Sequence, residues 1–247
     1  MPTKRVLVTG ASRGIGRAIA LRLARDGWTV AGHFAQNQEA AQEVESALGD
    51  ASAGWYQAQL SDADQAKNLL PRVLADGGLD AIVNNAGIYL KLDFADSSDG
   101  DFYDTLRQSM QVNFESPAQL IRAASQHFLA QGHGKVLNIA SRVGHRGEAG
   151  AAMYSASKAA LINLTRALAV EHASRNIQHF ALAPGWVETA MAREGMEERL
   201  PQILRDIPLG RMATPDDCAG AAAFLLSDEA AYLSGIVIDI NGASYLR

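Results

Sequence analysis

The stretch Val6-Leu7-Val8-Thr9-Gly10-Ala11-Ser12-Arg13-Gly14-Ile15-Gly16 decides the fold of this chain. An apolar run typical of a buried strand leads into a glycine-rich turn, and an amphipathic helical pattern follows over residues 15–25. Glycine permits a tight turn and lets backbone N–H groups approach an oxyanion closely, while the helix N-terminus adds partial positive charge. The stretch therefore predicts a strand, a phosphate-binding turn and a helix, with Gly10, Gly14 and Gly16 in the turn.

Short β-rich runs alternate with longer helical patterns along the rest of the chain. The predicted strands are residues 5–9, 29–34, 54–59, 81–84, 135–139, 177–183 and 236–240. The predicted helices are residues 15–25, 39–48, 64–75, 117–130, 152–174 and 215–226. This alternation predicts an α/β fold: a doubly wound, Rossmann-type parallel sheet of about seven strands, with helices on both faces. Because no linker or repeat divides the sequence, residues 1–247 are expected to form a single dinucleotide-binding and catalytic domain.

Two stretches interrupt the alternation. Residues 96–101 are polar and rich in turn-forming residues, so they are predicted to be a surface loop. Residues 184–215 form a long stretch with scattered helical signal and several helix-breaking residues. A segment of that length is uncommon without a function, so residues 186–212 are predicted to be a lid over the substrate; the alternative is a peripheral helical insertion.

The composition narrows the classes of function. The formal net charge of −5 argues against a general binder of nucleic acid or anionic membranes, which would need a basic field. Cys218 is the single cysteine, which excludes an intramolecular disulfide and a cysteine metal cluster, and the six histidines lack ligand spacing, so no metal site is expected. No run approaches the roughly 20 apolar residues of a membrane span, and no signal peptide is recognisable. We therefore expect a soluble, cytoplasmic protein.

The residues after the second predicted strand favour NADP(H) as the cofactor. Sites that prefer NAD usually place an acidic residue there to bind the adenosine ribose, whereas this chain has Ala35-Gln36-Asn37. Arg13, in the glycine-rich turn, is expected to meet a 2′-phosphate, with further hydrogen bonds from Ser12 and His33. The alternative is that Arg13 is an ordinary surface charge.

Tyr154 and Lys158 lie four residues apart in a predicted helix, so that a phenol and an ammonium share one face. An unperturbed tyrosine has a pKa near ~10, and a nearby cation that stabilises the phenolate would bring the phenol into range for acid–base catalysis. Ser141 follows the predicted strand 135–139, at the edge of the sheet where ligands bind, and its hydroxyl could bond a substrate oxygen.

These motifs, in this order, resemble the classical short-chain dehydrogenase/reductase family, and within it the 3-oxoacyl-acyl-carrier-protein reductases most. The resemblance is carried by residues 9–16, 84–87, Asn113, Ser141, 154–158, 184–189, 233–235 and 241–242. It implies a catalytic tetrad of Asn113, Ser141, Tyr154 and Lys158. By this resemblance, Tyr154 protonates the carbonyl oxygen that Ser141 orients, Lys158 lowers the tyrosine pKa and binds the nicotinamide ribose, and Asn113 holds a water.

The resemblance also implies where the cofactor lies. The predicted cofactor-binding residues are Gly10, Ser12, Arg13, Gly14, Ile15, Gly16, His33, Gln59, Leu60, Asn85, Ala86, Gly87, Tyr154, Lys158, Pro184, Gly185, Val187 and Thr189. Two positions depart from the family. Gln59-Leu60 stands where the family often has an acid or asparagine followed by valine, and Ala140 stands where many members have a second serine.

The implied activity is the NADPH-dependent reduction of a 3-oxoacyl thioester, carried on acyl carrier protein, to the 3-hydroxyacyl product in fatty acid biosynthesis. Arg142, Arg146 and Arg175 are candidates for contact with the acidic carrier; the alternative is that each is an ordinary surface arginine. The alternatives are a reductase or dehydrogenase of another ketone or secondary alcohol, and a non-catalytic NADP-binding subunit, which a damaged tetrad would mark. A serine hydrolase is disfavoured because no G-x-S-x-G elbow is present. The resemblance further implies a homotetramer, with helices 117–130 and 152–174 and the last strand at the interface.

Overall fold

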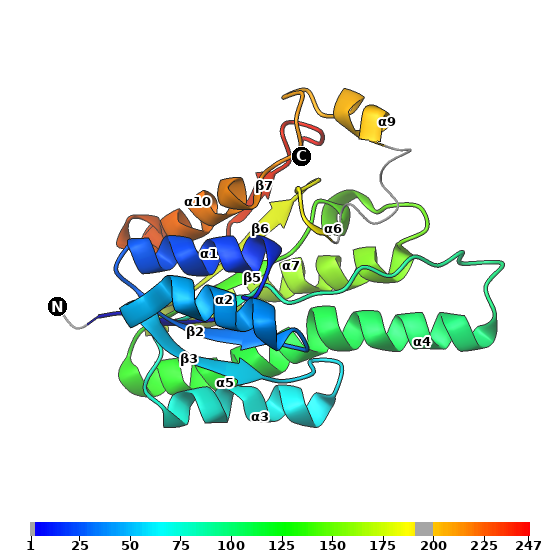
Figure 1. The fold of residues 1–247 in the computed structure, drawn as a ribbon. Coiled ribbons are helices and arrows are strands. Elements are labelled where there is room, and N and C mark those ends of the chain that lie inside the picture. The colour runs from blue at the N-terminus through cyan, green and yellow to red at the C-terminus, as the bar shows by residue number, and fades with distance from the viewer. Residues whose placement is uncertain (1–2, 191–199) are drawn as a thin grey trace.

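The structure, a computed structural model, describes residues 3–190 and 200–247. Within these residues, seven strands form one sheet in the order β3-β2-β1-β4-β5-β6-β7, and every neighbouring pair is parallel. Helices cover both faces of the sheet (Figure 1). The chain winds outward from β1 in both directions, first to β3 and then to β7. This topology confirms the predicted doubly wound, Rossmann-type α/β fold.

The elements follow one another in strict βα alternation through the first half of the chain. The strands are β1 (Arg5–Val8), β2 (Thr29–Phe34), β3 (Ser52–Gln57), β4 (Ala81–Asn84), β5 (Gly134–Ile139), β6 (Ile177–Pro184) and β7 (Val237–Ile240). The main helices are α1 (Gly14–Arg25), α2 (Gln38–Leu48), α3 (Ala63–Ala75), α4 (Asp99–Met110), α5 (Ser116–Gln131), α6 (Val143–Arg146), α7 (Ala152–His172), α9 (Leu200–Arg205) and α10 (Pro215–Leu226). Short turns of other helix types are η1 (Gly49–Ala51), η2 (Gln111–Glu115), η3 (Ala173–Arg175) and η4 (Asp228–Leu233).

The central strands are buried on both faces, which explains why they are apolar throughout rather than alternating. In β1, Val6 and Val8 belong to the core cluster formed with α1, α2 and α10. Leu7, between them, belongs to the cluster formed with α3 and α5 on the other face. All three side chains are completely buried, so the strand that precedes the glycine-rich turn is held rigidly.

Helix α4 corrects the prediction of a surface loop at residues 96–101, which is wrong for residues 99–101. The Ser98 hydroxyl accepts a hydrogen bond from the Asp101 N–H at 3.2 Å and caps the helix, and Asp99 and Asp101 add negative charge to its first turn. The same residue types favour turns and helix starts. No apolar periodicity in this segment distinguishes a turn from a helix start, because Ser109 is the one buried residue of α4.

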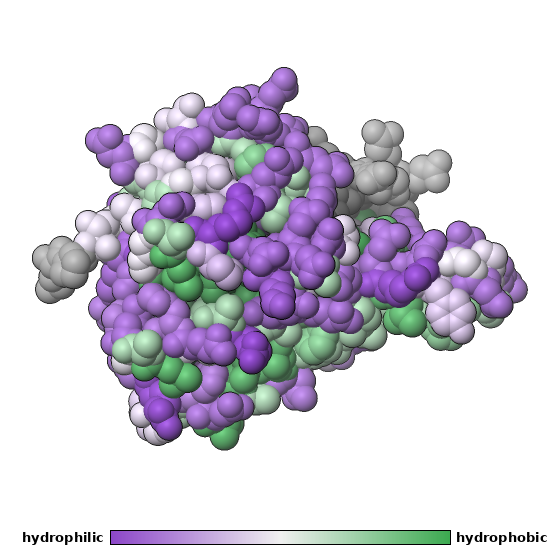
Figure 2. Space-filling model, turned by 90° about the horizontal axis from the view of Figure 1, so that it is seen from below, coloured by the Kyte–Doolittle hydropathy of each residue, from purple (hydrophilic) through white to green (hydrophobic). Residues whose placement is uncertain are grey.

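A π-helical segment, η2, joins α4 to α5 without a break, so that the chain is helical from residue 99 to 131. Such segments insert one residue into a helix and are frequent at functional sites. Figure 2 shows the face of the molecule seen from the side of α3 and α5, where hydrophilic side chains predominate and hydrophobic ones form separate small patches.

The predicted lid, residues 186–212, lies partly outside the described residues, because 191–199 are not described. Its two described ends are joined: the Ala213 N–H donates to the Trp186 carbonyl, and the Glu188 N–H donates to the Ala213 carbonyl, both at 2.9 Å. Ile203 and Met212 pack together with Trp186 in a small apolar cluster. None of the helices in the described ranges is long and apolar enough to span a membrane.

Candidate active site

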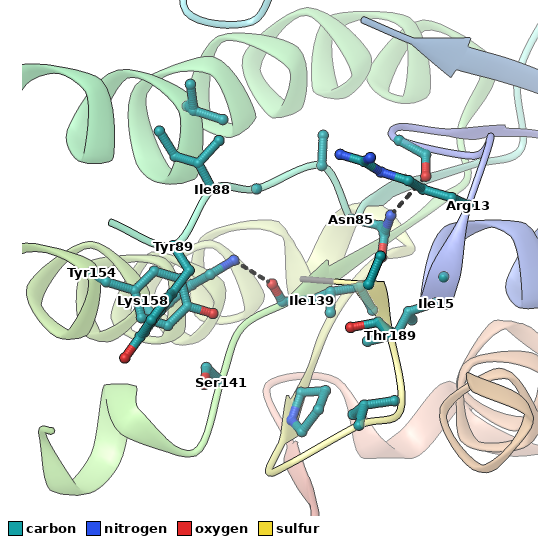
Figure 3. Close-up of a pocket in the computed structure, with 18 of the residues that line it drawn as sticks. Arg13, Ile15, Asn85, Ile88, Tyr89, Ile139, Ser141, Tyr154, Lys158 and Thr189 are labelled. Carbon is teal, nitrogen blue, oxygen red and sulfur yellow. Dashed lines mark hydrogen bonds between the residues drawn. The ribbon is translucent and has the colours of Figure 1, made fainter. Parts of the chain in front are cut away.

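A cavity of about 540 Å³ lies along the carboxyl ends of the strands. Residues that follow β1, β2, β4, β5 and β6 line it, as expected for ligand sites in open α/β sheets. Every predicted site residue except Gly16 and Asn113 lies on its wall: Gly10, Ser12, Arg13, Gly14, Ile15, His33, Gln59, Leu60, Asn85, Ala86, Gly87, Ser141, Tyr154, Lys158, Pro184, Gly185, Val187 and Thr189. Figure 3 shows Arg13 and Ile15 near one end and Tyr154, Lys158 and Ser141 near the other.

The glycine-rich turn requires its glycines for two separate reasons. Gly10 and Gly14 have φ values of +64° and +54°, a left-handed conformation that other residues adopt only with strain. Gly16 has no room for a side chain, since a Cβ there would lie 2.2 Å from the Gly10 carbonyl oxygen and 2.4 Å from Asn85 Nδ2. Gly16 therefore lies beneath the turn rather than on the cavity wall, and its role is to let the turn close on α1.

His33 supports the turn from inside the protein. Its Nδ1 accepts a hydrogen bond from the Gly10 N–H at 3.1 Å, so its Nε2 carries the proton and donates to the Ala58 carbonyl at 3.0 Å. Burial lowers its pKa to about 4, so the ring is neutral near pH 7. Both ring nitrogens thus have protein partners, which corrects the expected hydrogen bond from His33 to a 2′-phosphate. His33 instead ties the glycine turn to β2 and to the segment after β3.

The loop after β4 is bound to the glycine turn. Asn85 Nδ2 donates to the Thr9 carbonyl at 2.9 Å and to the Gly10 carbonyl at 3.2 Å. The Thr9 hydroxyl oxygen accepts hydrogen bonds from the N–H groups of Asn85 and Ala86, at 2.9 and 3.0 Å. Asn85 therefore lines the cavity and also holds the turn in place, so that hydrogen bonds join these two walls of the cavity.

The N-terminus of α1 faces the cavity without a side-chain cap. Arg13 occupies the N-cap position with extended backbone, and its side chain makes no capping hydrogen bond. The first N–H groups of a helix without such a cap are an anion-binding site. The side chain of Arg13 is exposed, lines the cavity and forms no ion pair with any residue in the described ranges. No carboxylate stands beside it after β2, where Ala35, Gln36 and Asn37 form the wall.

The segment after β6 closes the opposite side of the cavity. Gly185 packs against Asn241, whose Cβ would lie 3.0 Å from a Cβ at position 185. The methyl of Thr189 would lie 3.3 Å from a Cβ at position 14, so this segment reaches the glycine turn. This segment therefore runs along the cavity from the catalytic residues to the glycine-rich turn, and four of its predicted residues line the wall: Pro184, Gly185, Val187 and Thr189.

Tyr154, Lys158 and Ser141 meet at the end of β5. Lys158 Nζ lies 5.8 Å from the centroid of the Tyr154 ring and donates to the Ile139 carbonyl at 2.8 Å (Figure 3). Ser141 is hydrogen-bonded to the Tyr154 side chain, and this contact favours the phenolate. The two hydroxyl groups therefore lie next to each other on the cavity wall, where a substrate oxygen can meet both.

The electrostatics differ from the sequence-based expectation that Lys158 lowers the tyrosine pKa. Burial raises the pKa of Tyr154 to about 12, the Ser141 hydrogen bond opposes this, and the Glu148 carboxylate adds to it. Burial also lowers the pKa of Lys158 to about 8, because an ammonium in the interior loses hydration. Near pH 7 the phenol is thus fully protonated and Lys158 is mostly charged, the state of a proton donor beside a cation.

Asn113 lies behind the catalytic residues rather than on the cavity wall. It is completely buried in the π-helical segment η2, where its Oδ1 accepts from the Ile88 N–H at 2.9 Å and its Nδ2 donates to the Ile88 carbonyl at 3.0 Å. The Nδ2 group also donates to the Ser157 hydroxyl at 3.2 Å. Asn113 therefore connects the loop after β4 to the helix that carries Tyr154 and Lys158.

Sequence reasoning missed two residues of the catalytic end. The Tyr89 ring meets the Tyr154 ring edge to face, with centroids 5.0 Å apart, and the Tyr89 hydroxyl donates to Glu148 Oε1 at 2.9 Å. Both residues come from irregular segments between the elements, and no spacing in the sequence connects them. Within the described part of the chain, no group of three or more histidine, cysteine or acidic residues could hold a metal ion.

The three arginines predicted to contact a carrier do not lie together. Arg142 is buried, with 6% of its surface exposed, and lines the cavity. Arg146 lines a second, adjoining cavity. Arg175 belongs to η3, before β6 begins, and so lies at the opposite edge of the sheet from the cavity. Arg175 is therefore not one of the basic residues at the mouth of the cavity, and its exposure fits the alternative of an ordinary surface arginine.

Comparison with known proteins agrees with this geometry. A family model described as enoyl-(acyl carrier protein) reductase matches residues 10–243. The 3-oxoacyl-[acyl-carrier-protein] reductase of Staphylococcus aureus is 39% identical over 250 residues, which covers 99% of both chains. That of Escherichia coli is 38% identical over 244 residues and covers 98% of both.

Two solved structures superimpose closely. One, described as an NAD(P)-dependent gluconate 5-dehydrogenase from Beutenbergia cavernae with bound NADP, has a TM-score of 0.89 and 37% identity, covering 98% of this chain and 96% of that one. The other, a 3-ketoacyl-(acyl-carrier-protein) reductase from Brucella melitensis with NADH, has a TM-score of 0.89 and 31% identity, covering 98% of both.

Proposed function

This chain belongs to the short-chain dehydrogenase/reductase family of oxidoreductases, and we propose that it reduces a 3-oxoacyl thioester to the 3-hydroxyacyl product with NADPH. We propose that the acyl group is carried on acyl carrier protein, as the names of its relatives state for them, and that the product enters fatty acid biosynthesis. The observation that carries the proposal is the meeting of Tyr154, Ser141 and Lys158 on the cavity wall at the end of β5.

The described residues fit a nicotinamide dinucleotide. The space at Gly16 admits no Cβ, and the N-terminus of α1 has no side-chain cap, so backbone N–H groups are available to a phosphate. Arg13 would pair with a 2′-phosphate, assisted by Ser12, and the absence of a carboxylate at residues 35–37 supports NADP(H) over NAD(H). Gln59 and Leu60 would border the adenine, and the residues from Asn85 to Gly87 and from Pro184 to Thr189 would flank the rest of the cofactor.

The cofactor supplies the hydride; the chain supplies the proton and the orientation. We assign Ser141 to hold the substrate carbonyl oxygen and Tyr154 to donate its phenolic proton to that oxygen. The Lys158 ammonium stabilises the phenolate that remains. Asn113 positions the helix that carries Tyr154 and Lys158, through its hydrogen bonds to Ile88 and Ser157.

The electrostatics of the site suit the first step of a reduction. Reduction requires a protonated phenol, and burial keeps the pKa of Tyr154 far above neutrality, at about 12. Two hydroxyl donors that converge on one oxygen also suit a carbonyl better than the carbon–carbon double bond named in the family model's description.

A substrate panel with NADPH tests the proposal. Acetoacetyl-acyl carrier protein, acetoacetyl-coenzyme A and simple ketones are compared by the rate at which NADPH absorbance disappears. We expect the highest kcat/KM for the carrier-bound thioester. A clear preference for simple ketones would instead support a reductase of another ketone, the second candidate, which the likeness to a gluconate 5-dehydrogenase favours.

We further propose that the chain is a cytoplasmic homotetramer and that the described ends of residues 186–212 cover the substrate. Large apolar side chains are exposed on α4, α7 and η4, among them Tyr103, Val170 and Tyr232. Exposed apolar surface of this kind supports association. Light scattering tests the subunit number, and a monomer would contradict the proposal.

A further inference from the structure

Arg142 is a buried arginine at the substrate end of the cavity. It directly follows Ser141, its backbone N–H donates to the Pro184 carbonyl at 2.9 Å, and only 6% of its surface is exposed. Its side chain lines the catalytic cavity and also a second cavity of about 510 Å³ next to it. Glu148 and Trp186 also line both cavities, so the two spaces share one wall.

The guanidinium of Arg142 has few protein partners. Its Nη1 donates to the Ser244 hydroxyl at 2.9 Å, which is its one side-chain hydrogen bond to a described residue. Its Nε is buried without any hydrogen-bond partner. No described carboxylate lies within the 4.0 Å of an ion pair with it. A buried charge without a partner is costly, so an arginine in this state has hydrogen-bonding capacity left for a ligand.

The charged groups around Arg142 are engaged elsewhere. Glu148 accepts a hydrogen bond from the Tyr89 hydroxyl at 2.9 Å, and Asp206 accepts one from Gln202 Nε2 at 2.7 Å. Arg146, on the same cavity wall, repels the guanidinium. Burial lowers the pKa of Arg142 and the charge of Arg146 lowers it further, while the carboxylates of Glu148 and Asp206 oppose both effects in part. An anionic group bound in the second cavity, on the side of the two arginines, would offset the cost of burying the Arg142 charge and its repulsion from Arg146.

The second cavity does not resemble a site for an alkyl chain. Its wall consists of Arg142, Arg146, Glu148, Gln202, Asp206 and Ser244, together with Trp186 and Ile203. An acyl tail in such a place would gain two apolar neighbours, Trp186 and Ile203, and would bury polar and charged groups without satisfying their hydrogen bonds. Charged and amide side chains suit a polar group that can accept their hydrogen bonds.

We propose that Arg142 determines substrate specificity by binding an anionic group of the substrate, a carboxylate or a phosphate, in the second cavity while the carbonyl lies against Ser141 and Tyr154. The inference rests on the proposed carbonyl reduction and narrows its substrate class. The anion has two chemical sources: a carboxylate on the ketone or acyl part, or the phosphate of a phosphopantetheine arm. Guanidinium binds either group through paired, charge-assisted hydrogen bonds.

Two substrate pairs distinguish the sources. The first pair is levulinate and its methyl ester, which differ in the carboxylate. The second pair is acetoacetyl-phosphopantetheine and acetoacetyl-N-acetylcysteamine, which differ in the phosphate. We compare kcat/KM for all four with NADPH in the wild type, Arg142→Met and Arg142→Lys. Arg175→Met is the matched control, because Arg175 is exposed at the opposite edge of the sheet.

The wild type is expected to prefer the anionic member of one pair by at least ~10-fold, as a charge-assisted contact would give. Arg142→Met should abolish that preference while leaving NADPH affinity unchanged, and its melting temperature is measured to show that the variant is folded. Arg142→Lys should retain part of the preference, and Arg175→Met all of it. The pair that responds identifies the source of the anion.

Lack of an anion preference in the wild type overturns the inference, and this result does not depend on the folding of any variant. An equal preference in the wild type and in folded Arg142→Met overturns it as well. Reduction of the neutral thioester without an anion preference would leave the proposed function intact. An Arg142-dependent preference for levulinate without thioester turnover would refute the thioester assignment alone.

Discussion

Replacement of Gly16 by alanine tests whether the glycine-rich turn is closed against α1 as tightly as the structure shows. A Cβ at position 16 would lie 2.2 Å from the Gly10 carbonyl oxygen and 2.4 Å from Asn85 Nδ2. Neither neighbour can move freely. Gly10 is held by its N–H bond to His33, and Asn85 by its bonds to the Thr9 and Gly10 carbonyls. The turn itself must therefore shift.

The size of the effect follows from that shift. Overpacking of a rigid site typically costs ~1–3 kcal/mol of stability. A displaced turn also misdirects the N–H groups that would hold the cofactor phosphates. We expect the dissociation constant of NADPH to rise ~100-fold, which corresponds to about 2.7 kcal/mol. Fluorescence titration with NADPH and urea denaturation measure the two quantities.

Gly100→Ala is the matched control. Gly100 also lies in the first turn of a helix, α4, but the nearest atom to a Cβ there is Ser98 Oγ at an ordinary 3.7 Å. Alanine at this position should raise stability by up to ~1 kcal/mol and leave NADPH binding unchanged. A dissociation constant of Gly16→Ala for NADPH within ~3-fold of the wild-type value corresponds to less than 1 kcal/mol. That result would refute the idea that close packing at Gly16 determines the shape of the turn.

Further predictions concern the proton donor, the cofactor and pH. Tyr154→Phe should keep NADPH affinity and lose ~10²–10⁴-fold in turnover; residual turnover near the wild-type rate would show that another group is the acid. Arg13→Ala should weaken NADPH by ~10-fold or more and leave NADH nearly unchanged, and equal losses for both would mean that Arg13 does not bind the 2′-phosphate. Because burial lowers the pKa of Lys158 to about 8, the reduction rate should fall as pH rises through 8, and a flat profile would show that its charge is not needed. Burial lowers the pKa of His33 to about 4 and that of His179 to about 3, both from 6.5, so the unfolded state binds more protons between these values. The free energy of unfolding should therefore fall as pH drops below 6.5, by about 3 kcal/mol at pH 4 from His33 alone. Urea melts at pH 7 and pH 4 check this, and equal midpoints would refute it.

The architecture could be predicted because its main signals are local. Val6-Leu7-Val8 is apolar throughout because neighbouring residues of β1 face two different cores, and that burial is visible in the sequence as a continuous run. Helix α4 could not be predicted, since its sequence lacks an apolar stripe. Its start at Ser98 uses residues that also form turns, and the choice between them depends on what packs nearby.

Some features of the candidate site could likewise be predicted from the sequence, and others could not. The glycine-rich turn and the spacing of Tyr154 and Lys158 are short-range patterns, so both could be predicted. The partners of His33 depend on a neighbouring strand, and the burial of Arg142 depends on Ser244 at the far end of the chain. Such contacts arise from the fold as a whole, and no local spacing in the sequence indicates them.

The extra residue in η2 sets the rotation of one half of a long helix relative to the other. Each residue of an α-helix turns the chain by about 100°, so removing one residue from 111–115 would leave a helix but rotate α4 by that angle against α5. Asn113 could then no longer reach the Ile88 backbone while α5 kept its place under the sheet. Natural variation in chain length should therefore avoid this segment, even though the helix itself would tolerate the loss.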